Sequence, residues 1–254
     1  MPKKPLKVLS IDFDYFQKVS ADTLSSCYPD GKDNPTFLTK ITWVNHYACS
    51  EEQLKKVTLL EKPFGQICEL LLRHKFNTPC MAVNSHIHIY DFIKDHYSDK
   101  YDGCYIVNID THHDLFNSSS KLDCGNWGTH IKKLIPKTQI TWIANPVSKE
   151  MYGIEENTEL SKIIETDFSK ILGKTFDIIF LCRSDTWLPP HLDKYFDELY
   201  TILTTNFASC IIDKQITKPR FTDDELQEAI EEYRNVASSM DTLRELNSKA
   251  NKGD

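Results

Sequence analysis

The chain has 254 residues, of which 40% are hydrophobic and 26% charged, as in a globular protein with a sizeable core. Its formal net charge of −7 argues against a DNA- or RNA-binding surface, which needs a basic face, and suits a cationic partner. No apolar stretch reaches the ~18 residues that a membrane helix needs. The first residues run directly into a strand-like segment, and none of the 8 cysteines forms a Cys-x-x-Cys pair. We therefore expect a cytoplasmic protein with reduced cysteines, without a presequence and without a membrane or nucleic-acid role.

Alternating strand and helix patterns predict the fold class. Apolar runs rich in β-branched residues predict five strands, at residues 6–13, 79–84, 103–110, 138–145 and 176–182. Helical patterns are found at residues 50–75, 88–97 and 190–206. Ser50 and Gln53 resemble a capping box for the first of these helices, Pro63 is expected to break it, and residues 18–50 are expected to be irregular. This order predicts a three-layer α/β/α fold with a mainly parallel sheet.

The C-terminal segment, about residues 222–250, is expected to be a helix. Thr222 and Glu225 form a capping box at its start. An apolar stripe follows, which consists of Leu226, Ile230, Tyr233, Ala237 and Met240. The stripe predicts either docking on the body of the same chain or contact with a partner or a second copy. Because no linker or repeat is visible, we expect a single domain over residues 1–254.

Three of the predicted strands end in residues that bind metals or move protons. These residues are Asp12 and Asp14, then His86 and His88, then Asp110, His112, His113 and Asp114. Positions i and i+2 of an extended chain share a face, so the two aspartates of the first strand point the same way. Since ligands bind beyond the carboxyl ends of parallel strands, the three ends are expected to meet at one site.

Four carboxylates at one place would repel one another unless protons or cations neutralise them. Two divalent cations would do so, and oxygen ligands with a few imidazoles favour Mn²⁺, ahead of Mg²⁺, Fe²⁺ and Zn²⁺. Each motif also has a simpler interpretation. The Asp-x-Asp pair could be a solvated loop or a dehalogenase-type phosphatase motif, although Tyr15 and Phe16 do not fit the latter. His86 could be a structural histidine, and Thr111 interrupts an Asp-His-His phosphoesterase motif.

The motifs resemble those of the arginase and ureohydrolase superfamily. The stretch from Asp110 to Asp114 matches its Asp-x-His-x-Asp signature, and "SIDFD" from Ser10 to Asp14 is similar to its Ser-x-Asp-x-Asp signature. "CGNWGTH" at residues 124–130 resembles its Gly-Asn-x-His segment. In arginases the Ser-x-Asp-x-Asp strand comes last, whereas here it comes first, so the order is permuted. The resemblance implies an arginase- or deacetylase-like fold, and among ureohydrolases the chain is most similar to the peptide arginases.

The resemblance also implies a ligand set for two Mn²⁺ ions. Asp12 and Asp110 would bridge the two ions, His86 and Asp114 would complete one site, and Asp14 and His112 the other. His88 is an alternative to His86. His113, on the opposite face from His112, is expected to pack or to form a hydrogen bond.

Further roles follow from the same resemblance. A metal-bridging hydroxide would attack the guanidinium carbon, and His130 would be the catalytic proton shuttle, although it could be a surface histidine. Asp185 would bind the substrate guanidinium, with Asp123 and Glu61 as alternatives. Trp127 would stack on the substrate or belong to the core.

The implied substrate is an arginine-containing, ribosomally made precursor peptide, whose arginines would become ornithine with release of urea. Agmatine, a formamide, an acyl-lysine amide or a phosphoester are the alternatives for the same metal site. A non-catalytic protein that binds a basic peptide is the alternative from another class. The oligomeric state stays open, and a homo-oligomer is one possibility.

Overall fold

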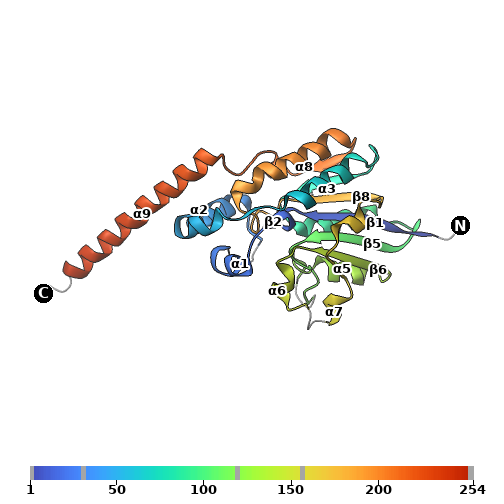
Figure 1. Cartoon of the computed structure of the whole chain (residues 1–254), viewed down its shortest axis with the longest axis horizontal. Helices are drawn as coiled ribbons and strands as arrows, with labels where there is room; N and C mark the ends of the chain where they lie inside the picture. The colour runs from blue at the N-terminus through green and yellow to red at the C-terminus, as the bar shows by residue number, and fades with distance from the viewer. Residues whose placement is uncertain (1–2, 30–32, 118–120, 155–157, 251–254) are drawn as a thin grey trace.

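The computed structural model describes residues 3–29, 33–117, 121–154 and 158–250. Its centre is a seven-stranded sheet in the order β7-β6-β5-β1-β8-β4-β9, in which every neighbouring pair is parallel. Figure 1 shows this sheet with helices on both faces. The strands are β1 (Lys4–Asp12), β4 (Cys80–Val83), β5 (Tyr101–Asp110), β6 (Thr138–Ala144), β7 (Ile164–Glu165), β8 (Ile178–Cys182) and β9 (Cys210–Ile212). The predicted three-layer α/β/α class is confirmed.

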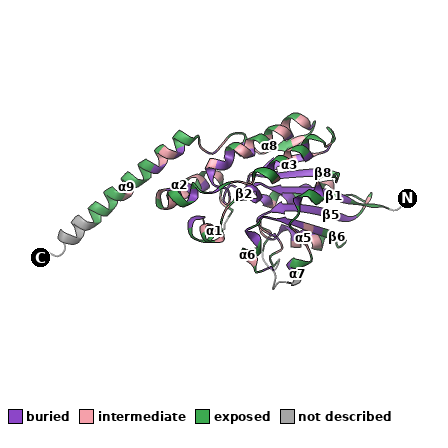
Figure 2. Ribbon diagram, in the orientation of Figure 1, coloured by how far each residue is buried: buried purple, intermediate pink, exposed green. Residues whose placement is uncertain are grey.

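Two apolar clusters lie on opposite faces of the sheet, because successive strand residues point to opposite sides. Leu9 and Ile11 belong to one cluster, together with residues of α2 (Thr36–Leu54), α3 (Glu61–Leu72) and α8 (Asp193–Asn206). Leu6 and Val8 belong to the other cluster, with residues of α4 (Ile89–His96) and α5 (Trp127–Leu134). Figure 2 shows the strands as the buried centre of the molecule. Burial on both faces explains why these strands read as continuous apolar runs.

All five predicted strands are present, but the segment before the second strand differs from the prediction. Residues 18–50, expected to be irregular, contain α1 (Ala21–Cys27) and most of α2. Ser50 is not a helix cap: it lies at a kink inside α2, with φ −138° and ψ 34°. The chain leaves the helix after Leu54, and Pro63 falls in the first turn of α3, where its missing N–H costs little. The predicted break thus exists, but ahead of the proline.

The shortest elements had no sequence signal, because a two- or three-residue strand shows no periodicity. They include the hairpin of β2 (Gln17–Lys18) and β3 (Thr58–Leu59) and the edge strands β7 and β9. The remaining short helices are η1 (Phe13–Phe16), η2 (His86–His88), α6 (Ser148–Tyr152), α7 (Thr158–Ser161), η3 (Phe168–Ile171), η4 (Pro190–Leu192) and η5 (Lys214–Ile216).

The predicted C-terminal helix is confirmed as α9 (Asp223–Ala250). Its capping box is formed, since the Thr222 N–H donates to Glu225 and the Glu225 N–H donates to Thr222 Oγ1. The start of α9 lies against α2, and Figure 1 shows the rest projecting away from the body. Among the described helices, none combines the length and apolar character that crossing a membrane requires. The single-domain assignment stays a prediction.

Candidate metal centre

The site begins where two central strands change from apolar to polar on one face. Ser10 and Asp12 continue the face of Val8 on β1, and Asn108 and Asp110 continue the corresponding face of β5. The parallel register places Ser10 directly beside Asn108. Because both strands run in the same direction, their terminal carboxylates reach the same edge of the sheet.

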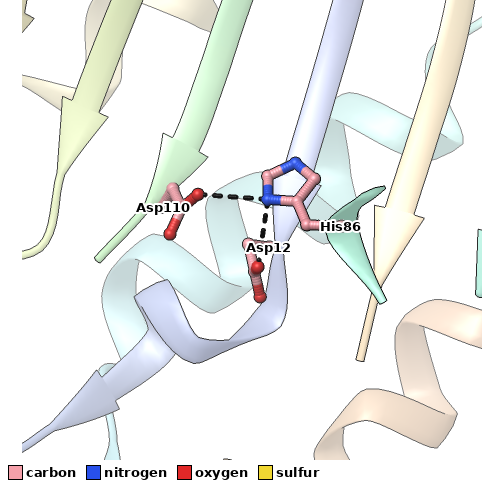
Figure 3. Close-up of side chains that lie close together, drawn as sticks. All are labelled: Asp12, His86 and Asp110. Carbon is pink, nitrogen blue, oxygen red and sulfur yellow. Dashed lines mark ion pairs between the residues drawn. The ribbon is translucent and has the colours of Figure 1, made fainter. Parts of the chain in front are cut away.

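The 3₁₀ turn η2, which follows β4, brings His86 to this edge. Its Nδ1 atom lies 3.1 Å from Asp12 Oδ2, 3.2 Å from Asp110 Oδ2 and 3.0 Å from Asp114 Oδ2. Figure 3 shows how the His86 ring meets Asp12 and Asp110. On the other side of the ring, Nε2 lies 2.7 Å from Ser10 Oγ. This hydrogen bond fixes the ring so that Nδ1 faces the carboxylates.

A second group forms beside the first and shares one carboxylate with it. His112 Nδ1 lies 3.0 Å from Asp14 Oδ2 and 3.5 Å from Asp110 Oδ1. Asp110 therefore directs one oxygen to each histidine. The ligand atoms of Asp12, His86 and Asp110 lie within 4.8 Å of one another, and so do those of Asp14, Asp110 and His112. Each group is close enough to hold a metal ion, and Asp110 belongs to both.

Burial and mutual repulsion disturb the carboxylates of the site. Asp12 has its pKa raised to about 7, first by burial and then by the charges of Asp14 and Asp110. Burial and Asp110 also raise the pKa of Asp14 and, more strongly, that of Asp114. Ionising these buried carboxylates costs free energy, which either protonation or nearby positive charge offsets.

The two histidines supply part of that charge. Burial lowers the pKa of both rings, but Asp114 and the other carboxylates around His86, and Asp14 and Asp110 around His112, outweigh it and raise both well above the ordinary value. Burial likewise opposes ionisation of Asp110, yet the two rings hold its pKa well below the ordinary value. Without a cation the site thus draws protons onto its imidazoles.

Metal ions fit this site better than protons do. Four buried carboxylates face at most two positive imidazoles, and the described cavity lining contains no Lys or Arg. Asp14 Oδ2 is buried and makes no hydrogen bond, although His112 Nδ1 lies nearby. Three aspartate oxygens surround one nitrogen of His86, which can donate only one good hydrogen bond. Oxygen ligands with imidazole nitrogens, in excess negative charge, are the donors of a divalent-metal site.

Asp114 lies beside the first group and is held by the segment that starts α5. Its backbone has a left-handed φ of 54°, and its Oδ2 accepts a 2.5 Å hydrogen bond from Trp127 Nε1. Its carbonyl accepts a 3.1 Å hydrogen bond from the Gly128 N–H. A Cβ at Gly128 would lie 2.8 Å from the Leu115 side chain and 3.0 Å from the Asp114 carbonyl. The Gly-Asn-x-Gly stretch around residue 126 is therefore the support of the metal loop.

We expect Gly128→Ala to lower the free energy of unfolding by about 1–3 kcal/mol, because the added methyl displaces the loop that carries Asp114. Metal affinity should fall with it. Gly65→Ala is the matched control: it lies in α3 with nothing within 4 Å, and alanine should stabilise the helix by about 0.5–1 kcal/mol. Chemical denaturation of both variants tests this, and equal effects would contradict the tight contact at Gly128.

A cavity of about 690 Å³ opens above the two groups. Its described walls include Asp33, Asp123 and Tyr152, which belong to neither of the two Asp/His groups. Ser85 donates a hydrogen bond to Asp33, and the Trp187 ring lies 4.6 Å from the His112 ring. The acidic walls and the carboxylate floor make the cavity suitable for a positively charged ligand.

The structure brings together the six residues predicted as metal ligands, which are Asp12, Asp14, His86, Asp110, His112 and Asp114. Of the two histidines after β4, His86 faces the carboxylates, whereas His88 is exposed. His113 packs between Phe116 and Tyr152 and accepts the Leu115 N–H, as expected.

Three predicted roles in catalysis or substrate binding do not agree with the geometry. His130 lies on α5 with its ring near Tyr90 and does not line the cavity, so it is not placed to shuttle a proton to a substrate there. Trp127 is 1% exposed and orients Asp114, so it is core rather than a stacking surface. The Asp185 carboxylate is already occupied by an arginine of its own chain, Arg183, at 2.5 and 3.1 Å.

Of the alternatives to Asp185, Asp123 lines the cavity, whereas Glu61 is exposed at the start of α3 and lies outside the described lining. Sequence reasoning missed the roles of Ser10 and Asn108, which orient His86 and Asp110. The signal was available, because each stands two positions before a ligand on its strand and so shares its face. Asp33 and Trp187 gave no such signal, since they reach the cavity from distant loops.

Comparisons with protein-family models, with curated proteins and with solved structures found no match for this chain. The features of this chain that indicate a function are therefore its short motifs and the geometry of its aspartate and histidine side chains.

Proposed function

We propose that the chain is a dinuclear manganese hydrolase that converts arginine residues within a peptide to ornithine and releases urea. The observation that carries this proposal is the position of Asp110, which presents one oxygen to each of two buried Asp/His groups. A carboxylate shared in this way suits two cations held close together. The motif resemblance to ureohydrolases supplies the reaction, and the geometry agrees with its ligand set.

His86 with Asp12 and Asp110 would hold one ion, and His112 with Asp14 and Asp110 the other. Asp114, next to His86 Nδ1, would complete the first set. Two metal ions held in this way would supply a hydroxide at neutral pH and stabilise negative charge on the reacting group. In the described arrangement Asp12 belongs to the first group, whereas the resemblance implies that it also bridges.

The side chains around the ions would bind and orient the substrate. Asp33 and Asp123 on the cavity wall would face a planar cation, and carboxylates pair well with guanidinium groups. Trp187, against His112, would shield the His112 side of the centre from bulk solvent.

Two features favour a peptide over free arginine or a phosphoester. No Lys or Arg stands among the described cavity-lining residues, so neither an α-carboxylate nor a phosphate would meet a counter-charge from the protein. The acidic walls would repel both. An arginine inside a peptide has no free α-carboxylate and brings only its positive charge.

The test is to load the protein with Mn²⁺ and to incubate it separately with an arginine-containing peptide, the same peptide with lysine instead, free arginine and agmatine. We expect only the arginine peptide to lose one carbon, two nitrogen and two hydrogen atoms per conversion in its mass spectrum, with an equal amount of urea. A chelator should stop the reaction, and Mn²⁺ should restore it. Turnover of agmatine or of free arginine instead would overturn the peptide assignment. Chelator-insensitive binding of both peptides without turnover would favour a non-catalytic protein.

A further inference from the structure

The distal part of α9, from Tyr233 onward, projects away from the body of the chain, apart from Arg234, which pairs with Glu51 of α2. At its start, Leu226 and Ile230 are 6% and 1% exposed, because they pack on the body. From Tyr233 to Arg244 the described side chains are exposed, apart from the half-buried Ala237. Figure 2 shows this part of the helix in the colour of exposed residues. Four large apolar side chains are among them, namely Tyr233 (38% exposed), Val236 (55%), Met240 (51%) and Leu243 (60%).

One series of mostly apolar positions of α9, separate from the buried Ile230, repeats with the spacing of a coiled coil. Steps of three and four residues alternate along the whole helix, which keeps these positions on one narrow face. Beyond Leu226, which packs on the body, the described residues of this face are Ala229, Tyr233, Val236, Met240 and Leu243.

A lone helix of this composition would be marginal in water. The segment Asn235–Thr242 contains asparagine, valine, two serines, aspartate and threonine, which are weak helix formers. Among the described side chains of α9 beyond Arg234, the ion pair between Arg244 and Asp241 at 3.2 Å is exposed and adds little. Isolated helices usually need packing of an apolar face to persist. The distal part of α9 thus has the apolar spacing of a coiled coil, and packing against a second helix would stabilise it.

The distribution of charge along α9 favours pairing with α9 of a second copy in the antiparallel direction. Residues 223–232 carry six acidic side chains and no Lys or Arg, whereas residues 244–252 carry Arg244, Lys249 and Lys252 with one acid, Glu245. A parallel pair would place the six acids of one helix beside the six of the other. An antiparallel pair places the acidic part of each helix beside the basic part of the other.

We infer that α9 forms an antiparallel two-helix coiled coil with α9 of a second copy of this chain. In the register centred between Val236 and Met240, Tyr233 packs against the second copy's Leu243, and Val236 packs against the second copy's Met240. Each contact occurs twice, as a two-fold axis requires. The paired stretch from Tyr233 to Leu243 is about 16 Å long at 1.5 Å per residue.

A groove on the body lies at the end of this paired stretch. It has a volume of about 420 Å³ and runs between α2 and α9, with Ile41, Val44, Phe221 and Tyr233 among its walls. Ile41 is 61% exposed there. The antiparallel arrangement brings the second copy's Leu243 to this groove, because Leu243 packs against Tyr233 in the stated register.

Sedimentation equilibrium of the full chain over a range of concentrations tests the inference. We expect a reversible dimer, and Met240→Glu should weaken it by at least about 100-fold, because each dimer then buries two unpaired carboxylates. Ser238→Glu is the matched control, since this exposed residue lies on the opposite face of the helix and should leave the dimer unchanged. Circular dichroism checks that both variants stay folded. A wild-type monomer at every concentration, or a dimer that Met240→Glu leaves intact, overturns the inference.

A cysteine at Ser239 tests the direction of the helices. In the antiparallel register Ser239 lies beside Ser239 of the second copy across the two-fold axis. In a parallel pair the two serines would lie on opposite sides of the coiled coil. With the exposed Cys49 replaced by serine, Ser239→Cys should form a disulfide-linked dimer on mild oxidation. Ser238→Cys in the same background should not. A dimer by sedimentation without the Ser239→Cys cross-link would overturn the antiparallel direction.

Discussion

Replacing Asp110 by asparagine should lower the affinity for Mn²⁺ by at least about 100-fold and reduce arginine conversion to the same degree. Asp110 is fully buried and is the residue common to both Asp/His groups, so one substitution weakens both metal positions. Asparagine keeps the shape of the side chain but loses the negative charge. Its remaining oxygen cannot face both His86 and His112 as two carboxylate oxygens do. Calorimetric titration with Mn²⁺ and the peptide mass assay measure the two effects.

The same strand offers a matched control for Asp110. Asp102 lies near the start of β5 and is paired with Lys137 at the surface. Asp102→Asn removes an equal charge from the same strand, and exposed pairs contribute little, so metal binding and turnover should stay at wild-type levels. If both variants bound Mn²⁺ like the wild type, Asp110 would not be a metal ligand and the proposed centre would be wrong.

Replacing Arg183 by leucine should lower the free energy of unfolding by about 3–5 kcal/mol, the usual cost of breaking a buried ion pair from one side. The side chains of Arg183 and Asp185 are 0% and 2% exposed. Besides its two bonds to Asp185, Arg183 donates to the carbonyls of Lys218 and Gln215 at 2.9 and 3.1 Å. Leucine would leave a buried carboxylate and two carbonyls without these donors. Denaturant titration of the metal-free protein gives the change.

Arg73→Leu is the control for Arg183, because the ion pair of Arg73 with Glu69 is exposed and its loss should cost less than about 1 kcal/mol. Asp185→Asn distinguishes a structural role of Asp185 from a role in binding the substrate. As the partner of Arg183, Asp185 should affect stability and leave the KM for the peptide unchanged. A raised KM without loss of stability would return Asp185 to the substrate-binding role that its sequence context suggested.

The predicted role of Asp185 depends on whether its carboxylate is free to meet a substrate. "FLCRSD" contains both a guanidinium and a carboxylate, and the sequence alone does not say whether they meet. In the folded chain they form a bidentate pair. Arg220 lies close by and donates to Asp193 and to backbone carbonyls, so the loop after β8 is fixed by two buried arginines. A substrate guanidinium would have to displace a partner already in place.

The sequence by itself determined the layers of this protein and the identity of its candidate metal ligands. Apolar runs long enough to show periodicity predicted the five central strands, since burial on both sheet faces requires such runs. The i, i+2 spacing in "SIDFD" and "NIDTHHD" placed the carboxylates on common faces, because strand geometry is a local property.

Only the tertiary structure decided which residues meet. In the folded chain His86, and not His88, faces the carboxylates, and Trp127 donates a hydrogen bond to Asp114. Arg183 pairs with Asp185, and His130 lies near Tyr90, outside the described cavity lining. The tertiary structure also brought Asp33 and Trp187 to the cavity from loops far apart in the chain. Pairings between distant segments depend on strand order, loop path and packing, none of which has a period in the sequence. Local strand geometry therefore fixed the candidate ligands, and the strand order β5-β1-β8-β4 fixed what surrounds them.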